Sequence, residues 1–589
     1  MKNFRSLQEW VHWMEMGPGA RWVRLAAFCV GVLLLSLRIG YTQFRGAKSE
    51  TTLSQAVVGR QLAEGGGFTS LVRYPQTVAV LRGNGKKLDL ERPLPELYQA
   101  PLYPAVIGGA LAVLPARLHH SLFETAPVPP DGFRADYLLL AVNVLLLWAA
   151  IALTWLLARR LFDANVAYIS AIGLLLCTGV WAETVAVNGT PLMMVLILGL
   201  ALLLVQGDAA VAAGKPLRPW FFAAGVVCGL MFLCDYWAGL AVLPAGVYAA
   251  WRCSGRAGMA AVLGIAIGFI LLVYPWMSRN MALTRNPLGL AAQGIALKVG
   301  DPFAEPEIFR NTLSAEGPTL ELRKLGNKVL TGLQKALGEQ IWTGGLLFAA
   351  LFATGLLYQF RSALANRARW LVFATGSVLI VGQAFFDSGE GERCAAICLV
   401  PFLVVFGAAF FSVLVASNQS LSAHAPWLTA LFLGLQAIPL LHSAFEPRRS
   451  HFQFPPYYPA VYLGMREDAA QRVGVAWMSD VPAGAAWYSG QKVWSQPTRL
   501  RDFYAIGVDQ PIYALVLSPK TLDRPFFGGL NRVAANADRL GEWAQVYTGL
   551  VTNRFPAGFP LIQCQKVAEN LYVLFNPQAL MPGSGRSNR

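Results

Sequence analysis

The sequence predicts a polytopic α-helical membrane protein with a small α/β domain at its C-terminal end. Of its 589 residues, 55% are hydrophobic and only 14% are charged. The mean hydropathy is +0.45. Long apolar stretches alternate with clusters of arginine, and this composition excludes a soluble multidomain protein.

About eleven apolar stretches approach the roughly 20 residues that cross about 30 Å of hydrocarbon. They are residues 22–41, 136–157, 166–182, 190–205, 220–236, 237–251, 259–277, 341–360, 370–386, 394–416 and 426–442. The first is too long for the apolar part of a signal peptide, so we expect it to remain as a span. Residues 101–115 form a shorter run bracketed by prolines, which favours a juxtamembrane or re-entrant helix. The predicted membrane domain covers residues 22–443.

Arginine clusters predict the direction of each span. Arg21 and Arg24 precede the first stretch, and further clusters recur after every second later one. These are Arg159 and Arg160, Lys215 and Arg218, Arg252 and Arg256, and Arg361, Arg367 and Arg369. Because cytoplasmic turns are rich in Lys and Arg, residues 1–21 are expected to be cytoplasmic. The outer loops 42–135 and 278–340 and the chain after residue 444 then face away from the cytoplasm.

The net charge of +15 does not predict a nucleic-acid partner. Many of the excess basic residues lie in the predicted cytoplasmic turns, where orientation and anionic lipid account for them. The lipid bilayer is therefore the partner that this charge pattern indicates.

After the last span the chain changes character. Apolar runs at 473–478, 512–517 and 571–575 read as strands, a helix is expected around 529–546, and Pro and Gly separate these elements. Residues 444–580 are therefore predicted to form an extracytoplasmic α/β domain. The final stretch, 581–589, is expected to be disordered.

Three acidic residues fall on the predicted outer face of the membrane domain. Glu50 is the first acid after the opening span and precedes an amphipathic stretch at 53–62. Ser49 and Glu50 also suit the start of a helix, which is the structural interpretation. Glu183 lies on a short outer loop, and Asp235 lies between two spans, where an acid is costly to bury.

Four short motifs carry a resemblance to a known family. They are Ser49-Glu50, the run from Tyr98 to Pro104, the run Tyr274-Pro275-Trp276-Met277-Ser278-Arg279-Asn280, and Glu390-Gly391-Glu392-Arg393-Cys394. With these motifs, residues 24–443 resemble the GT-C glycosyltransferases, in particular the dolichyl-phosphate-mannose protein mannosyltransferase and lipid A aminoarabinose transferase group.

The resemblance implies an enzyme of the cell inner (plasma) membrane. Such enzymes transfer a hexosyl or pentosyl group from a polyprenyl-phosphate donor to an acceptor hydroxyl on the extracytoplasmic face, usually with inversion. The acceptor stays open among a protein, lipid A, a glycan and another lipid. Two alternatives also stay open: a non-catalytic scaffold that binds polyprenyl lipid, and a glycolipid transporter.

The resemblance also implies roles for individual residues. Glu50 stands at the family's first-loop catalytic acid, so it is the expected general base, with Glu183 and Asp235 as further catalytic candidates. Arg279 and Arg393 would bind the donor phosphate, supported by Glu392, Asn280 and Tyr98. The structural interpretation of the two arginines is that they extend to lipid headgroups.

The chain departs from the family at several positions. Gln99 and Ala100 stand where many members carry a Lys or His, Thr190 stands where members often carry an acid, and Cys394 replaces a tyrosine. No cofactor and no metal are predicted, because no outer loop has clustered acids at ligand spacing. A divalent cation would require Glu50 to converge with Glu183 or Asp235.

Overall fold

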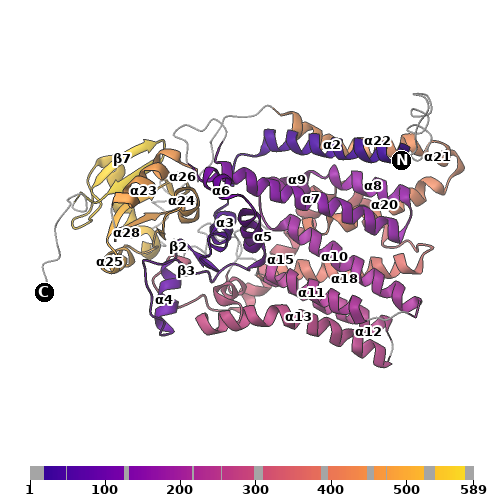
Figure 1. Ribbon diagram of the computed structural model, residues 1–589, viewed down its shortest axis with the longest axis horizontal. Helices are drawn as coiled ribbons and strands as arrows, with labels where there is room; N and C mark the ends of the chain where they lie inside the picture. Colours follow the sequence, from indigo (N-terminus) through magenta and orange to yellow (C-terminus); the bar gives the residue numbers. More distant parts are fainter. Residues whose placement is uncertain are drawn as a thin grey trace.

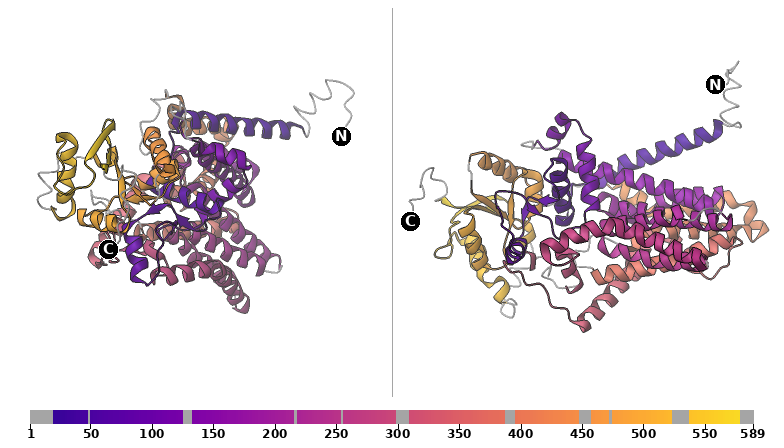
Figure 2. Two further views of the ribbon diagram at one scale, coloured as in Figure 1. Left: turned by 60° about the vertical axis from the view of Figure 1, so that its left-hand side comes forward. Right: turned by 60° about the horizontal axis from the view of Figure 1, so that its bottom comes forward.

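A computed structural model describes residues 19–47, 49–124, 132–214, 218–253, 255–297, 309–386, 395–446, 457–471, 474–522 and 537–577. A bundle of long helices occupies one end of the molecule and an α/β domain the other (Figures 1 and 2). The predicted disordered tail, 581–589, and most of the predicted cytoplasmic segment, 1–21, lie outside the described residues.

The apolar stretches predicted as spans are helical. They form α2 (Gly19–Gln43), α7 (Arg134–Leu161), α8 (Ala164–Leu175), α9 (Thr178–Val185), α10 (Thr190–Ala212), α11 (Arg218–Cys234), α12 (Val242–Arg252), α13 (Gly255–Thr284), α16 (Ile341–Gly345), α17 (Leu347–Gly355), α18 (Ala363–Phe386), α19 (Ala395–Cys398), α20 (Val400–Ala416) and α22 (Ala425–Phe445). The predicted fold class is thereby confirmed.

Helix length alone does not fix the number of spans. In the described part of the chain, six helices are long and apolar enough to cross a membrane, or up to eight if each bent pair forms one span. α11 and α20 have 17 residues each, and α12 has 11, so they fall short of the length of a straight crossing. The count of about eleven stays a prediction.

The short run at 101–115 forms one helix, and a second helix begins just after it. α5 (Leu102–Ala112) and α6 (Ala116–Leu122) are bent by 119° at the break between them. α5 packs closely on α3 (Glu50–Ala63). The two backbones approach so closely that a Cβ on Gly108 would lie only 2.8 Å from the carbonyl oxygen of Gly59. Such a bend occurs in a broken span and in a re-entrant loop, so the predicted placement of this run stays a prediction.

The α/β domain contains a six-stranded sheet in the order β2-β5-β4-β6-β8-β7. β2, β5, β4 and β6 run parallel to one another. β8 pairs antiparallel with both β6 and β7. Their bounds are β2 (Val72–Arg73), β4 (Ala476–Ser479), β5 (Val493–Ser495), β6 (Ile512–Leu517), β7 (Gln563–Ala568) and β8 (Leu571–Phe575). β6 and β8 confirm two predicted strands, and β4 overlaps the third.

Further elements lie outside the predicted spans and the six-stranded sheet. In the outer segments these are α4 (Pro75–Gly83), α15 (Leu322–Lys335) and the strand pair β1 (Thr69–Ser70) and β3 (Leu94–Pro95). The tail adds α23 (Pro459–Gln471), α24 (Pro482–Ser489), α25 (Leu500–Asp509), α26 (Pro519–Leu522) and α28 (Ala537–Thr552). α21 (Gln419–Ala423) joins α20 to α22. The helix predicted around 529–546 overlaps α28.

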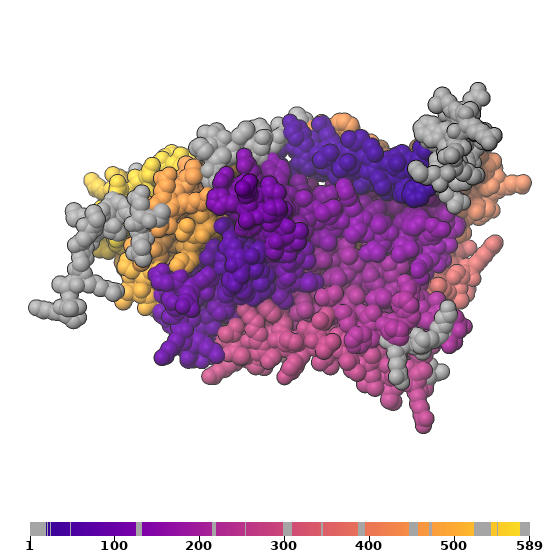
Figure 3. Space-filling view, in the orientation of Figure 1, coloured from indigo at the N-terminus to yellow at the C-terminus, as the bar shows by residue number. Residues whose placement is uncertain are grey.

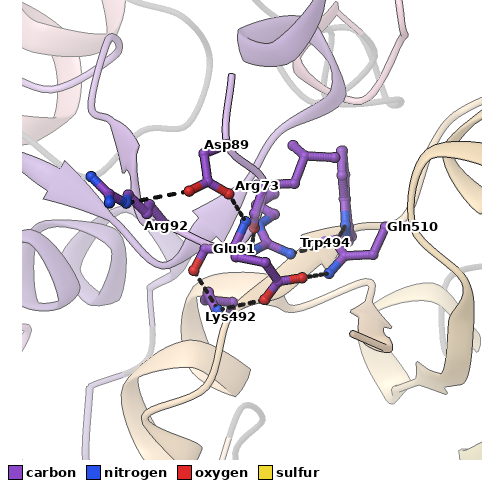
Figure 4. Close-up of polar contacts among 8 residues, drawn as sticks. Arg73, Asp89, Glu91, Arg92, Lys492, Trp494 and Gln510 are labelled. Atoms are coloured by element: carbon purple, nitrogen blue, oxygen red, sulfur yellow. Dashed lines mark hydrogen bonds and ion pairs between the residues drawn. The ribbon is translucent and has the colours of Figure 1, made fainter. Parts of the chain in front are cut away.

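The sequence did not predict that the first outer loop contributes β2 to this sheet. Val72 pairs with Val493, and Arg73 with Trp494. The Arg73 side chain is 1% exposed. It lies beside Gln510 (Figure 4) and donates to Gln510 Oε1 at 2.6 Å. It also donates to the carbonyl oxygen of Leu90. Burial lowers the Arg73 pKa to about 10, although the charges of nearby Glu91 and Asp89 raise it.

The second outer segment also contacts the domain. The Asn311 carbonyl oxygen accepts from the Thr498 N–H at 2.8 Å, and Asn311 Oδ1 accepts from Ser495 Oγ at 2.7 Å. In the space-filling view, violet atoms of the first outer loop lie against orange atoms of the α/β domain (Figure 3). Parts of the three segments predicted to share one face therefore pack together, and the side of the membrane they face stays a prediction.

Candidate functional site

Glu50 begins α3 and bonds to a helix of the α/β domain. Ser49 Oγ accepts from the Thr52 N–H at 3.2 Å and so caps α3. The Glu50 carboxylate accepts from the backbone N–H groups of Ala483 at 2.9 Å and Gly484 at 3.2 Å. These groups are at the amino end of α24, where the helix dipole favours a negative charge. Glu50 thus links the first outer loop to the tail.

Glu183 and Asp235 both lie beside Thr190. The Glu183 carboxylate accepts from Asn188 Nδ2 at 2.7 Å and from Thr190 Oγ1 at 2.9 Å. Asp235 and Thr190 line the same narrow cleft, which has a volume of only about 10 Å³ and is also lined by Cys398. The position where family members often carry an acid is therefore a threonine that binds an acid from α9.

Arg279 points into the first outer loop. Its Nη1 donates to the Glu96 carbonyl oxygen at 3.0 Å and to Asn280 Oδ1 at 2.9 Å, and its Nη2 donates to the Phe68 carbonyl oxygen at 3.2 Å. The guanidinium carbon lies 4.6 Å from the centre of the Trp276 ring, a cation–π contact. These contacts within the protein differ from the arrangement of an arginine that extends to lipid headgroups.

Glu96 is an acid of this site that the sequence analysis missed. It is 2% exposed, and one of its carboxylate oxygens accepts from the N–H groups of Tyr98 at 2.7 Å and Gln99 at 3.2 Å. Burial raises the Glu96 pKa, while these N–H donors and the charges of Arg310 and Arg279 oppose the rise. An acid within the apolar run just before Tyr98 was the available sequence signal.

Tyr236 connects two of the family-like motifs. Its hydroxyl accepts from Trp276 Nε1 at 2.9 Å and donates to the Gln99 carbonyl oxygen at 3.5 Å. Tyr98 Oη donates to Gln76 Oε1 at 3.0 Å, and the Arg310 guanidinium lies 4.7 Å from the Tyr98 ring centre. The structure thus brings Tyr98, Arg279 and Asn280 into one cluster, with Asp235 adjacent to its Tyr236.

Two predicted site residues, Glu392 and Arg393, lie outside the described residues. Their roles stay predictions. Within the described ranges, no group of three or more His, Cys, Asp or Glu side chains could hold a metal ion. The expected lack of a metal or other cofactor also stays a prediction, because no ligand is present to test it.

Comparisons with known proteins identify the fold. Residues 134–278 match the sequence model of the family described as dolichyl-phosphate-mannose-protein mannosyltransferase. The crystal structure of ArnT from Cupriavidus metallidurans bound to undecaprenyl phosphate is similar over 95% of this chain and 99% of that chain, at 14% identity and a TM-score of 0.50. This chain shares the fold of that structure, as the resemblance to GT-C enzymes led us to expect. The resemblance found in the sequence motifs is therefore confirmed.

A second structure is less similar to this chain. The oligosaccharyltransferase AglB from Archaeoglobus fulgidus, in complex with an inhibitory peptide and a dolichol-phosphate, matches 84% of this chain and 70% of that chain. Its identity is 10% and its TM-score is 0.48. Among curated protein sequences, a search found no significant match to the chain.

Proposed function

We propose that this GT-C protein is a membrane glycosyltransferase that moves a sugar from a polyprenyl-phosphate donor to an acceptor hydroxyl on the extracytoplasmic face. The match of residues 134–278 to a mannosyltransferase family carries this proposal. The matched region contains Glu183 and Asp235 and ends one residue before Arg279. Similarity to a structure that contains undecaprenyl phosphate supports a lipid-phosphate donor.

The chemistry needs a base for the acceptor hydroxyl and positive charge near the departing phosphate. Glu50 is the proposed base. The α24 N–H groups fix the direction of its carboxylate and stabilise its negative charge. Arg279 and Arg393 are proposed to stabilise the charge on the phosphate. A single displacement with one base inverts the anomeric carbon, and no residue is required as a covalent nucleophile.

The proposed setting is the cell inner membrane, with the N-terminus in the cytoplasm and the α/β domain outside. The transferred group is a hexosyl or pentosyl unit, and the acceptor is a protein, lipid A, a glycan or another lipid. Mass spectrometry of envelope glycolipids and glycoproteins from a deletion strain would identify the product that is lost.

The direct test uses purified protein in nanodiscs with polyprenyl-phosphate sugars. Glu50→Gln keeps the size of the side chain but removes its basicity, so transfer should fall about 100- to 10,000-fold while the donor still binds. Glu321→Gln, at an exposed acid just before α15, is the matched control and should retain transfer. If Glu50→Gln retains transfer and Glu183→Gln or Asp235→Asn abolishes it, the base is assigned wrongly. If all three variants transfer normally, none of these three acids is the base.

Arg279 offers a second test of the same function. Arg279→Ala should lower the rate roughly 30- to 1000-fold, because a charge-assisted contact to the transition state is lost. Arg279→Lys should restore only part of the rate, since an ammonium cannot bond in two directions like the planar guanidinium. A normal rate in a well-folded Arg279→Ala variant would show that Arg279 only packs against the first outer loop.

One observation favours a second candidate, a non-catalytic scaffold that binds polyprenyl lipid. The Glu50 carboxylate is already engaged by α24, which is the arrangement of a docking contact. The scaffold predicts binding of polyprenyl phosphate by the purified protein without transfer from any polyprenyl-phosphate sugar. Transfer by the wild-type protein would exclude it.

A further inference from the structure

α24, the short helix whose amino end bonds to Glu50, contacts α3 at both of its ends. All residues of α24 are buried. Glu50 bonds to its amino end, and Arg60 Nη1 donates to the carbonyl oxygen of Trp487 near its carboxyl end at 3.5 Å. Glu50 and Arg60 are ten positions apart on α3, so the two helices lie side by side and run in the same direction. Each charge complements the helix end that it meets.

A glycine permits the contact at the carboxyl end. Gly490 follows α24 with a φ of +71°, in the left-handed region that favours glycine. A Cβ at this position would lie 3.1 Å from Arg60 Nη1. The chain can therefore turn away from α24 while Arg60 remains against its last turn.

Asp136, at the start of α7, bonds to side chains from the last turn of α24. The side chain is 1% exposed and accepts from Trp487 Nε1 at 2.9 Å and Tyr488 Oη at 3.0 Å. It also accepts from the backbone N–H of Ala47, three residues before Glu50, at 3.4 Å. One carboxylate thus bonds both to the segment that leads into Glu50 and to the helix that receives Glu50.

The segment before Glu50 is shaped for this contact. Gly46 has a φ of +94°, and a Cβ there would lie 3.0 Å from Asp136 Oδ2. The loop can approach Asp136 only because this position has no side chain. A buried carboxylate is costly to desolvate, and its three donors here are all neutral. Tryptophan and tyrosine rings could pack without an acid, so packing alone does not explain Asp136.

We propose that Asp136 and the amino end of α24 position Glu50, so that the α/β domain completes the transfer site. This inference rests on the proposed function and assigns Asp136 as a positioning residue that acts through Glu50. Because a reacting group displaced by about 1 Å can lose on the order of 100-fold in rate, the effect of loosening this clamp is measurable.

The activity test uses the full chain in nanodiscs with a polyprenyl-phosphate sugar. Asp136→Asn should lower kcat about 10- to 100-fold while the KM for the donor changes less than about twofold. Tyr488→Phe removes one of the three bonds and should cause a smaller loss, which keeps the test usable if Asp136→Asn folds poorly. The matched control is Arg82→Gln. It breaks the Arg82–Asp509 ion pair, which also joins the first outer loop to the α/β domain, and should leave kcat unchanged.

The double variant separates positioning from an independent role. If Asp136 acts through Glu50, adding Asp136→Asn to Glu50→Gln should cause no further loss of rate. Hydrogen exchange gives a readout that does not depend on activity. The Ala483 and Gly484 amides should exchange faster in Glu50→Gln and in Asp136→Asn, but not in Arg82→Gln.

The outcomes distinguish this inference from the proposed function. Normal kcat in folded Asp136→Asn, or losses that multiply in the double variant, would overturn the positioning role while Glu50 and the enzyme proposal stand. No transfer by the wild-type protein from any polyprenyl-phosphate sugar would overturn the proposed function, and the positioning role with it. Faster exchange of both amides together with a non-additive loss of kcat would support the inference.

Discussion

Two buried acids at opposite ends of the helix bundle are held in different ways. Asp136 lies at the end next to the α/β domain and bonds only to neutral donors among its described contacts. Asp208 lies near the other end of α10, about 27 Å along that helix from Thr190 at 1.5 Å per residue. It is 0% exposed and bonds to Arg252, Arg367 and Tyr248.

The comparison indicates that Asp208 belongs to a structural charge cluster, whereas Asp136 can help to position a catalytic group. At Asp208 two guanidinium groups compensate one carboxylate and join α10, α12 and α18. Removing one partner of such a cluster is costly, and little free charge remains for chemistry. Asp136 and Glu50 are oriented by hydrogen bonds from backbone, indole and phenol groups. In these contacts, both carboxylates are held by neutral donor groups.

The largest expected effect on stability is at Asp208, the acid that pairs with two arginines. Asp208→Ala leaves two guanidinium groups without their acid and should reduce the free energy of unfolding by about 3–5 kcal/mol. Thermal unfolding in detergent would measure this loss. Asp163→Ala removes the N-cap of α8 and is the control, with an expected loss of only about 1 kcal/mol. Equal losses in the two variants would contradict the assignment of Asp208 as a structural cluster.

Removing one of the two arginines should matter less. Arg367→Gln leaves Asp208 paired with Arg252, so the expected loss in the free energy of unfolding is about 1.5–3 kcal/mol, comparable to a hydrogen bond to a charged group. The same thermal unfolding experiment would measure it. Arg361→Gln changes an exposed arginine in the connection between α17 and α18, and as the control it should cost less than about 0.5 kcal/mol. A loss as large as that of Asp208→Ala would mean that Arg252 alone cannot compensate the acid.

At the opposite end, Glu50→Gln should affect stability only modestly. The amide oxygen can accept from one α24 N–H group, whereas the amide nitrogen cannot accept from the other. The expected loss is about 0.5–2 kcal/mol, as for a helix cap. Tryptophan fluorescence during denaturant unfolding would measure it. A loss above that of Asp208→Ala would show that Glu50 is mainly a structural anchor, and the contrast between the two ends would fail.

The last prediction concerns how the free energy of unfolding depends on pH through Glu96. Burial raises its folded-state pKa above the ordinary value, so its contribution to stability is fully present below the ordinary pKa of 4.5 and is lost as pH rises through the folded pKa. One proton changes stability by at most about 1.4 kcal/mol per pH unit. Wild-type unfolding midpoints should therefore fall relative to Glu96→Gln as the pH rises above 4.5. Parallel pH curves for the two proteins would contradict this.

Local patterns in the sequence predicted the elements well. The apolar stretches became helices, and the runs at 512–517 and 571–575 became β6 and β8. Length and hydropathy are local properties, so they can be read without the partners of each element. The number of spans could not be predicted from these local properties, because α11, α12 and α20 are shorter than a straight crossing. Their placement depends on packing.

The sequence by itself determined the fold class, the GT-C resemblance and the short list of acids and arginines worth testing. Only the tertiary structure decided that β2 joins a sheet built by the tail, that Glu50 bonds to Ala483 and Gly484, 433 and 434 positions away, and that Asp136 contacts both segments. β2 has only two residues, too few to show the alternating pattern of a strand. Asp136 stands at the start of an apolar run, where acids are common at membrane interfaces. Long-range partners follow from packing, which no local pattern encodes.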